Sequence, residues 1–163
     1  MTLLEIFDIE PYQWSSILTS ILCGGIIGLE RQVKGKPVGI RTASLITLGT
    51  YLFLTTAYLL KGQIIDPSRV VGQVITGIGF LGAGVMLAKE GGIIGVTSAA
   101  TIWVLAAIGV MISSNYLLPA IKLSLIVIII LAGIDFLEKH IEMLGRGIYS
   151  SVRSSFKKSK PDS

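Results

Sequence analysis

Long apolar runs, separated by short polar segments, occupy most of this chain. Five of these runs approach the roughly 20 residues that an α-helix needs to cross the hydrocarbon core of a bilayer. They cover residues 12–30, 42–61, 69–88, 94–114 and 116–137. Few polar residues separate the last two runs, and the third run is rich in glycine. The number of spans is therefore defined to within one. The pattern predicts an all-α, polytopic transmembrane helix bundle over residues 1–137.

Composition agrees with a membrane protein. Of 163 residues, 52% are hydrophobic and only 15% are charged, which is far from the composition of soluble domains. The first ten residues carry Glu5, Asp8 and Glu10 but no Lys or Arg, so we expect no cleavable signal and expect the apolar runs to stay in the mature protein. The net charge of +4 is better explained by where Lys and Arg stand along the membrane axis than by nucleic-acid binding. No nucleic-acid partner is expected.

The placement of Lys and Arg predicts the orientation, because these residues concentrate in short cytoplasmic loops. With the amino terminus outside, eleven of them fall inside and three fall outside. The inside set is Arg31, Lys34, Lys36, Arg41, Lys89, Lys139, Arg146, Arg153, Lys157, Lys158 and Lys160. The outside set is Lys61, Arg69 and Lys122. We therefore expect a multi-pass membrane protein, N-out and C-in, with a cytoplasmic carboxy terminus.

A different pattern begins after the last run, in residues 138–163. Apolar residues recur at steps of three or four from Leu137 to Phe156, with basic residues between them. This periodicity predicts a short amphipathic helix with a basic face, which would lie on the anionic lipids of the inner leaflet and be followed by a basic tail. A helix that simply extends from the last span and frays is the other interpretation.

Glycine is unusually frequent in the third run. The segment Gly77-Ile78-Gly79-Phe80-Leu81-Gly82 matches the G-x-G-x-x-G of dinucleotide-binding folds, but that motif requires a preceding strand and a βαβ unit. Small residues in lipid instead let helix backbones approach closely. The glycines expected to pack helices are Gly24, Gly28, Gly77, Gly79, Gly82 and Gly84. Some of these faces could pair between subunits, so we expect a homo-oligomer and favour a homodimer.

Charged side chains stand at the ends of the runs, since a charge in the bilayer centre is costly. Four of them fall at predicted cytoplasmic ends: Glu30, Arg31, Arg41 and Asp135. We expect them to form a cytoplasmic polar cluster in which opposite charges compensate one another. Independent snorkelling anchors are the open alternative.

Uncharged polar residues lie deeper, at Gln73, Thr76, Thr97, Ser98 and Thr101. Because water is scarce there, their donors and acceptors must find partners in the protein. Hydrogen bonding between the third and fourth runs is the plain expectation, and a small hydrophilic pocket or ion path is the alternative. The chain shows no nucleophile with a base, no metal-ligand spacing and no phosphate loop, so neither an enzyme nor a bound cofactor is expected.

These residues give the chain a resemblance to the MgtC/SapB family of bacterial inner-membrane proteins. Three blocks in order carry it: Gly28-Leu29-Glu30-Arg31 to Gly39-Ile40-Arg41-Thr42, then Gln73 to Gly84, then Gly95-Val96-Thr97-Ser98-Ala99-Ala100-Thr101-Ile102-Trp103. The resemblance implies a multi-pass protein of the bacterial plasma (inner) membrane with about five spans. It also implies a link to growth under magnesium limitation and, in pathogens, to survival inside host cells. Longer members carry a soluble carboxy-terminal domain after the last span, where we expect only a short basic tail here, so no function of that domain is transferred.

The resemblance also frames two functional expectations. Members have been described as magnesium transporters, but the family is better regarded as regulators, and contact with the ATP synthase has been proposed for some. We therefore expect a regulator that binds another membrane complex, with a transporter of magnesium or another cation as the alternative. Mg²⁺ would then be a sensed or transported ion. The absence of Asp or Glu in the middle of the spans weighs against transport, because Mg²⁺ prefers oxygen ligands in a wet site.

Overall fold

The computed structural model describes residues 8–60, 66–89 and 92–140. Its long helices are α2 (Trp14–Val33), α3 (Ile40–Leu59), α4 (Pro67–Gly84), α5 (Val96–Ser113) and α6 (Leu117–His140). The predicted all-α bundle is confirmed, with helix bounds within a few residues of the apolar runs. By length and composition, three helices could cross a membrane: α3, α5 and residues 117–134 of α6. Of the predicted amphipathic helix and tail, residues 138–140 belong to the end of α6, and residues 141–163 lie outside the described part of the chain.

Asn115 resolves the uncertain boundary between the last two runs. It has a φ of +64°, which is the left-handed conformation that ends many helices. The amide N–H of Asn115 donates to the Ile112 carbonyl at 2.9 Å, and that of Tyr116 donates to the Met111 carbonyl at 3.0 Å. These two hydrogen bonds form a Schellman motif, so α5 ends here and α6 begins as a separate helix.

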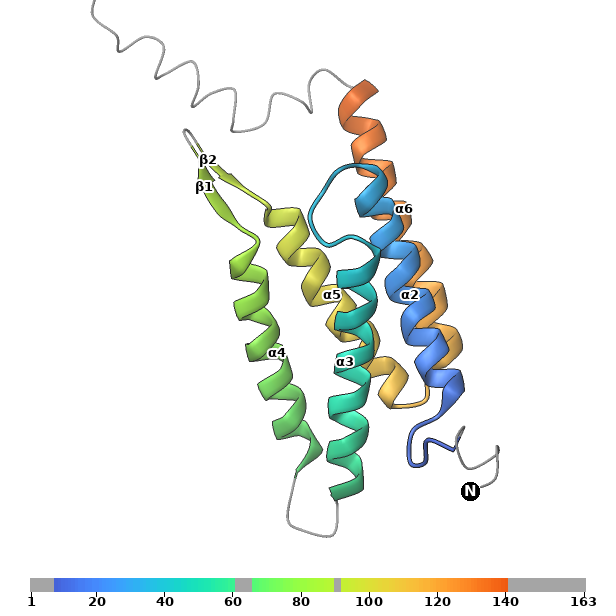
Figure 1. The fold of residues 1–163 in the computed structure, drawn as a ribbon. Coiled ribbons are helices and arrows are strands. Elements are labelled where there is room, and N and C mark those ends of the chain that lie inside the picture. Colours follow the sequence, from blue (N-terminus) through green and yellow to red (C-terminus); the bar gives the residue numbers. More distant parts are fainter. Residues whose placement is uncertain (1–7, 61–65, 90–91, 141–163) are drawn as a thin grey trace, which may run out of the picture.

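The helices run side by side and alternate in direction (Figure 1). The turn at 34–39, the connection between α4 and α5, and the end of α6 therefore share one end of the bundle (Figure 1). This is the arrangement that the distribution of Lys and Arg requires. Which side of the membrane this end faces stays a prediction, N-out and C-in.

Glycine brings α2, α3 and α5 into close contact. A Cβ added to Gly24 would lie 2.6 Å from the Ser44 Cα, and one added to Gly28 would lie 2.6 Å from the Ile40 Cα. On α5, a Cβ at Gly109 would lie 2.7 Å from the Thr47 carbonyl of α3. At all three positions a larger side chain would collide with the backbone of α3, and only glycine fits. Helix α3 is therefore in close contact with α2 on one side and with α5 on another.

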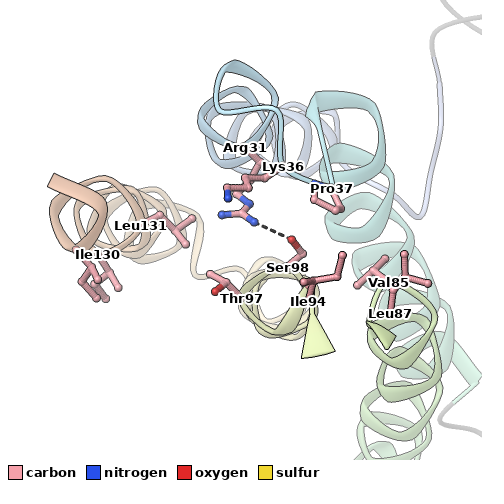
Figure 2. Close-up of a pocket in the computed structure, with 12 residues that line it drawn as sticks. Arg31, Lys36, Pro37, Val85, Leu87, Ile94, Thr97, Ser98, Ile130 and Leu131 are labelled. Carbon is pink, nitrogen blue, oxygen red and sulfur yellow. Dashed lines mark hydrogen bonds between the residues drawn. The ribbon is translucent and has the colours of Figure 1, made fainter. Parts of the chain in front are cut away.

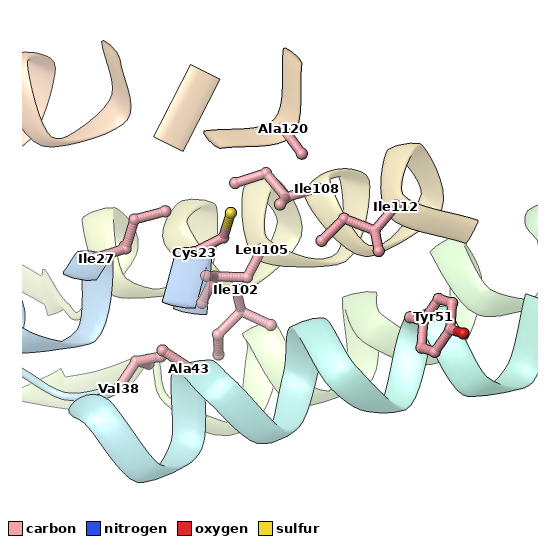
Figure 3. Close-up of a cluster of buried hydrophobic side chains, with 10 residues drawn as sticks. All are labelled: Cys23, Ile27, Val38, Ala43, Tyr51, Ile102, Leu105, Ile108, Ile112 and Ala120. Carbon is pink, nitrogen blue, oxygen red and sulfur yellow. The ribbon is translucent and has the colours of Figure 1, made fainter. Parts of the chain in front are cut away.

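The buried core fills the space between these helices (Figure 3). Its fully buried members include Cys23 and Ile27 of α2 and Leu105 of α5. Cys23 is a free thiol with no exposed surface, as expected for a small packing residue. Many large apolar side chains are exposed on the described surface of the bundle, as a lipid-facing surface requires.

Helix α4 departs from the predicted glycine packing. A Cβ at Gly77, Gly79 or Gly84 would meet nothing within 4 Å, whereas one at Gly82 would touch Ala99 of α5 at an ordinary 3.6 Å. These three glycines therefore do not pack helices together within the described part of the chain. Packing between subunits stays a prediction.

A short β-hairpin connects α4 to α5 and was not predicted. Strands β1 (Leu87–Lys89) and β2 (Gly92–Ile94) pair antiparallel, with Leu87 opposite Ile94. Gly95 follows β2 with a φ of +92°, and a Cβ there would overlap the Val85 carbonyl. Only glycine fits this turn, so Gly95 serves the connection and not a helix-packing face.

Asp66 caps α4 outside the apolar runs and gives the fold a pH-dependent contribution. The Ser68 hydroxyl and amide donate to its carboxylate at 2.8 and 2.9 Å, which lowers the pKa of Asp66 below its ordinary value. A carboxyl group whose pKa is lower in the folded than in the unfolded state stabilises the fold at pH values above its unfolded pKa. This stabilisation is lost as the pH falls through the folded-state pKa. Asp66→Ala is therefore expected to lower the thermal midpoint at pH 7, with a difference from the unchanged protein that narrows on acidification. A constant difference between pH 7 and pH 3 would contradict this assignment.

Candidate functional site: a cationic cavity at one end of the bundle

Arg31 is the central residue of the candidate site. It lies in the last turn of α2, yet only 4% of its surface is exposed. Its Nη2 donates to the Ser98 hydroxyl of α5 at 2.7 Å (Figure 2). Its Nε is buried without a hydrogen-bond partner, and no described carboxylate forms an ion pair with it. A neutral hydroxyl is thus the only described side-chain partner of a buried guanidinium.

The end of α2 is a second Schellman motif, and it brings another cation beside Arg31. Gly35 has a φ of +63°, its N–H donates to the Gln32 carbonyl at 3.0 Å, and the Lys36 N–H donates to the Arg31 carbonyl at 2.9 Å. In this motif the residues at the positions of Arg31 and Lys36 commonly make an apolar contact. Here both are cationic, and both line the same cavity (Figure 2).

The first turn of α5 forms another part of the wall. Gly95 precedes the helix and gives no side-chain cap, and the first turn contains no acidic residue. The amide N–H groups of a first helical turn have no partner within the helix, and they carry partial positive charge. Thr97 and Ser98 of this turn line the cavity, where Ser98 is buried and Thr97 is exposed.

These parts enclose a cavity of about 570 Å³. Its remaining walls are mostly aliphatic, with α6 on one side and the hairpin on the other (Figure 2). The described residues that line it are Arg31, Lys36, Pro37, Val85, Leu87, Ile94, Gly95, Thr97, Ser98, Ile130, Leu131 and Ile134. Two cations and no carboxylate stand among them.

The structure does not assemble the predicted four-residue polar cluster. Arg41 is exposed and does not line the cavity, and the side chain of Asp135 lies outside what the structure describes. Glu30 forms an ion pair with Lys34, the residue after α2, with Nζ and Oε1 2.7 Å apart. Lys34 also donates to the Leu131 carbonyl of α6 at 3.3 Å. Of Glu30, Arg31 and Arg41, the three with described side chains, only Arg31 lines the cavity.

The deeper polar residues also separate. Thr76 and Thr101 donate to carbonyls of their own helices, those of Gly72 and Thr97, at 2.9 and 2.8 Å. Gln73 is exposed on α4. The expected hydrogen bonds between the third and fourth runs are therefore not formed among the described residues. Ser98 instead joins the fourth run to the first.

Sequence reasoning did not single out Lys36, Gly35 or Gly95 as site residues. Each glycine carried a readable signal: Gly35 lies shortly after the first predicted run, and Gly95 is the second residue of the fourth. Glycine at these positions commonly marks a left-handed turn. The pairing of Arg31 with Ser98 had no signal in the sequence, because 67 positions separate the two residues.

Comparison with known proteins places the chain among membrane proteins of one family. The MgtC family model matches residues 17–140. The chain is 33% identical to Protein MgtC of Salmonella typhimurium over 113 residues, which are 69% of this chain and 48% of that protein. It is 45% identical to YhiD of Escherichia coli K12, named as a candidate magnesium transporter, over 106 residues, which are 61% of this chain and 49% of that protein.

The chain spans about half the length of the curated relatives it matches. An uncharacterised protein of Haemophilus influenzae is 36% identical over 125 residues, which are 71% of this chain and 52% of that protein. No solved structure matches. The matched range contains every described residue of the cavity and all of helices α3 to α6. This chain belongs to the MgtC family.

Proposed function

We propose that this chain is a non-enzymatic regulator in a bacterial inner membrane, linked to magnesium limitation, which acts by binding another membrane complex. Its relatives include proteins named MgtC and one named as a candidate magnesium transporter. The bias of Lys and Arg supports a cytoplasmic carboxy terminus, and in that orientation the cavity would lie at the cytoplasmic end. The exposed aliphatic surface of the bundle fits contact with membrane lipids.

The charge of the cavity is the observation that carries this proposal. Mg²⁺ takes oxygen ligands, including carboxylates, and keeps several waters. The charged residues among those described as lining this cavity are Arg31 and Lys36, which repel a divalent cation. Among residues 8–60, 66–89 and 92–140, no group of three or more His, Cys, Asp or Glu could hold a metal. A role in binding fits these residues better than conduction of Mg²⁺.

The turn beside the cavity offers a surface for a protein partner. Val33 has 78% of its surface exposed, and Pro37 and Arg41 are exposed at the same end of the bundle. An apolar patch next to Arg is a composition that protein interfaces favour. The partner we propose is another inner-membrane complex, such as the ATP synthase, and the chain itself acts as a homo-oligomer.

A transporter of magnesium or another cation is the second candidate function. The name of the Escherichia coli relative favours it. The hydroxyl of Thr97 and the carbonyls of the turns at the cavity are oxygen ligands that an ion path could use.

Two measurements separate these functions. We expect purified protein in liposomes to show no Mg²⁺ flux, by an enclosed magnesium-sensitive dye, above protein-free vesicles. Because Cys23 is buried and is the only cysteine, Pro37→Cys adds one accessible thiol for cross-linking in native membranes. We expect it to capture a membrane complex that Lys122→Cys, at the opposite end of the bundle, does not capture. Mg²⁺ flux that Gln73→Ala reduces would contradict the regulatory function. Equal capture by the two cysteine variants would contradict the proposed partner surface at the turn.

A further inference from the structure

The cavity concentrates positive charge that no described protein group neutralises. Arg31 is buried to 96%, and the Ser98 hydroxyl is its only described side-chain hydrogen-bond partner. Burying a charge is expensive unless it is paired, and Arg cannot lose its proton under ordinary conditions. Its unpartnered Nε is one of five N–H donors that suit an oxyanion. An anion in the cavity would satisfy both the charge and the donor.

Two neighbouring features add to this charge. Lys36 lines the same cavity, and the Schellman motif fixes its backbone to that of Arg31. The uncapped first turn of α5 adds amide N–H groups with partial positive charge, and helix amino termini of this kind bind phosphates and carboxylates. The carboxy terminus of α2 favours cations, but the Arg31 and Gln32 carbonyls there are already engaged by the turn. Its dipole therefore offsets only part of two full charges.

The size and the walls of the cavity restrict the anion further. About 570 Å³ is within the range of small-molecule sites and is larger than a lone carboxylate needs. The polar groups gather on the side of α2 and α5, whereas Ile130, Leu131 and Ile134 of α6 form an aliphatic wall. This division suits a phosphate group that carries an apolar or uncharged substituent. Basic pockets between membrane helices commonly hold such groups from lipids.

We propose that this cavity is a phosphate-binding site, in which Arg31, Lys36 and the first turn of α5 hold the phosphate oxygens. The phosphate belongs to an anionic lipid headgroup or to a free phosphate compound, and both present the same oxygens to the same donors. The site does not depend on whether the protein regulates a partner or conducts a cation.

The test uses the purified full chain, stripped of lipid in a neutral detergent. One arm measures binding of inorganic phosphate by equilibrium dialysis, and the other measures binding of short-chain phosphatidylglycerol against phosphatidylcholine by native mass spectrometry. We expect saturable binding of one molecule per chain in at least one arm. Binding of inorganic phosphate identifies a free phosphate compound as a ligand, and preferential binding of phosphatidylglycerol identifies an anionic lipid.

Lys36 provides the variant least expected to disturb folding, because its side chain is exposed and makes no described side-chain hydrogen bond. Lys36→Ala is expected to weaken binding about tenfold, the loss typical of one charge-assisted hydrogen bond. Arg41→Ala removes an equal charge from the same end of the bundle but outside the cavity, and should change binding less than about twofold. The absence of binding in both arms, or equal weakening by the two variants, would overturn the site.

Discussion

Arg31→Met is expected to raise the thermal midpoint of the lipid-free protein in phosphate-free buffer and to remove anion binding. Methionine has a similar length and lies easily in an apolar site. The substitution removes a buried charge that has no described counter-ion, and replacing buried ionic groups with apolar ones often stabilises a fold by about 1–4 kcal/mol. The measurement is the thermal midpoint by intrinsic fluorescence in a neutral detergent, followed by the dialysis assay.

Ser98→Ala is the matched control, since it removes the other partner of the same hydrogen bond. It leaves the buried guanidinium without its described side-chain acceptor, which is expected to cost about 1–3 kcal/mol. The two substitutions should therefore shift the midpoint in opposite directions. A fall with both would show that Arg31 supports the fold, and the case for an unneutralised charge would be lost.

Gly28→Ala is expected to destabilise the bundle, whereas Gly79→Ala is expected to leave it unchanged or slightly more stable. At Gly28 the added methyl meets the Ile40 backbone at 2.6 Å, so α2 and α3 must separate, at a typical cost of about 1–3 kcal/mol. At Gly79 the methyl meets nothing within 4 Å. Replacing a helical glycine by alanine where there is space raises the free energy of unfolding by about 0.4–1 kcal/mol, because the unfolded chain loses conformational freedom. Both effects are read as thermal midpoints in the same detergent.

The same pair of variants reports on the predicted homo-oligomer. If Gly79 contacts a second copy in the membrane, Gly79→Ala lowers the oligomeric state measured by mass photometry while the fold of each chain survives. If both variants destabilise equally, the close approach of α2 and α3 does not explain the need for glycine at Gly28.

The bundle could be predicted from sequence because each span carries its own signal. A helix in lipid satisfies its backbone internally, so run length and hydropathy define it without knowledge of its neighbours. The hairpin between α4 and α5 lacked such a signal, since three-residue strands such as Leu87–Lys89 are too short for a pattern. Its glycines could be read only as a turn.

The site could be predicted less completely, because it depends on how the helices rotate and pair. Arg31 and Ser98 were both identified as candidates, but they were assigned to different groups. Which residues of a helix face its neighbours follows from packing, and here packing turns Arg31 inward and leaves Arg41 exposed. Glycine alone was equally ambiguous, since Gly28 packs against α3 but Gly79 meets open space.

The Glu30–Lys34 ion pair has a consequence for how the chain enters the membrane. Glu30 lies in the last turn of α2 and Lys34 follows the helix four positions later, with Glu nearer the amino terminus, which is the favoured order for such pairs. The counter-ion of Lys34 is therefore supplied by the same short segment and does not require α6, whose Leu131 carbonyl also accepts from Lys34. We therefore expect a fragment that ends after α3 to bear this charge as a pair before the last helix of the bundle is added.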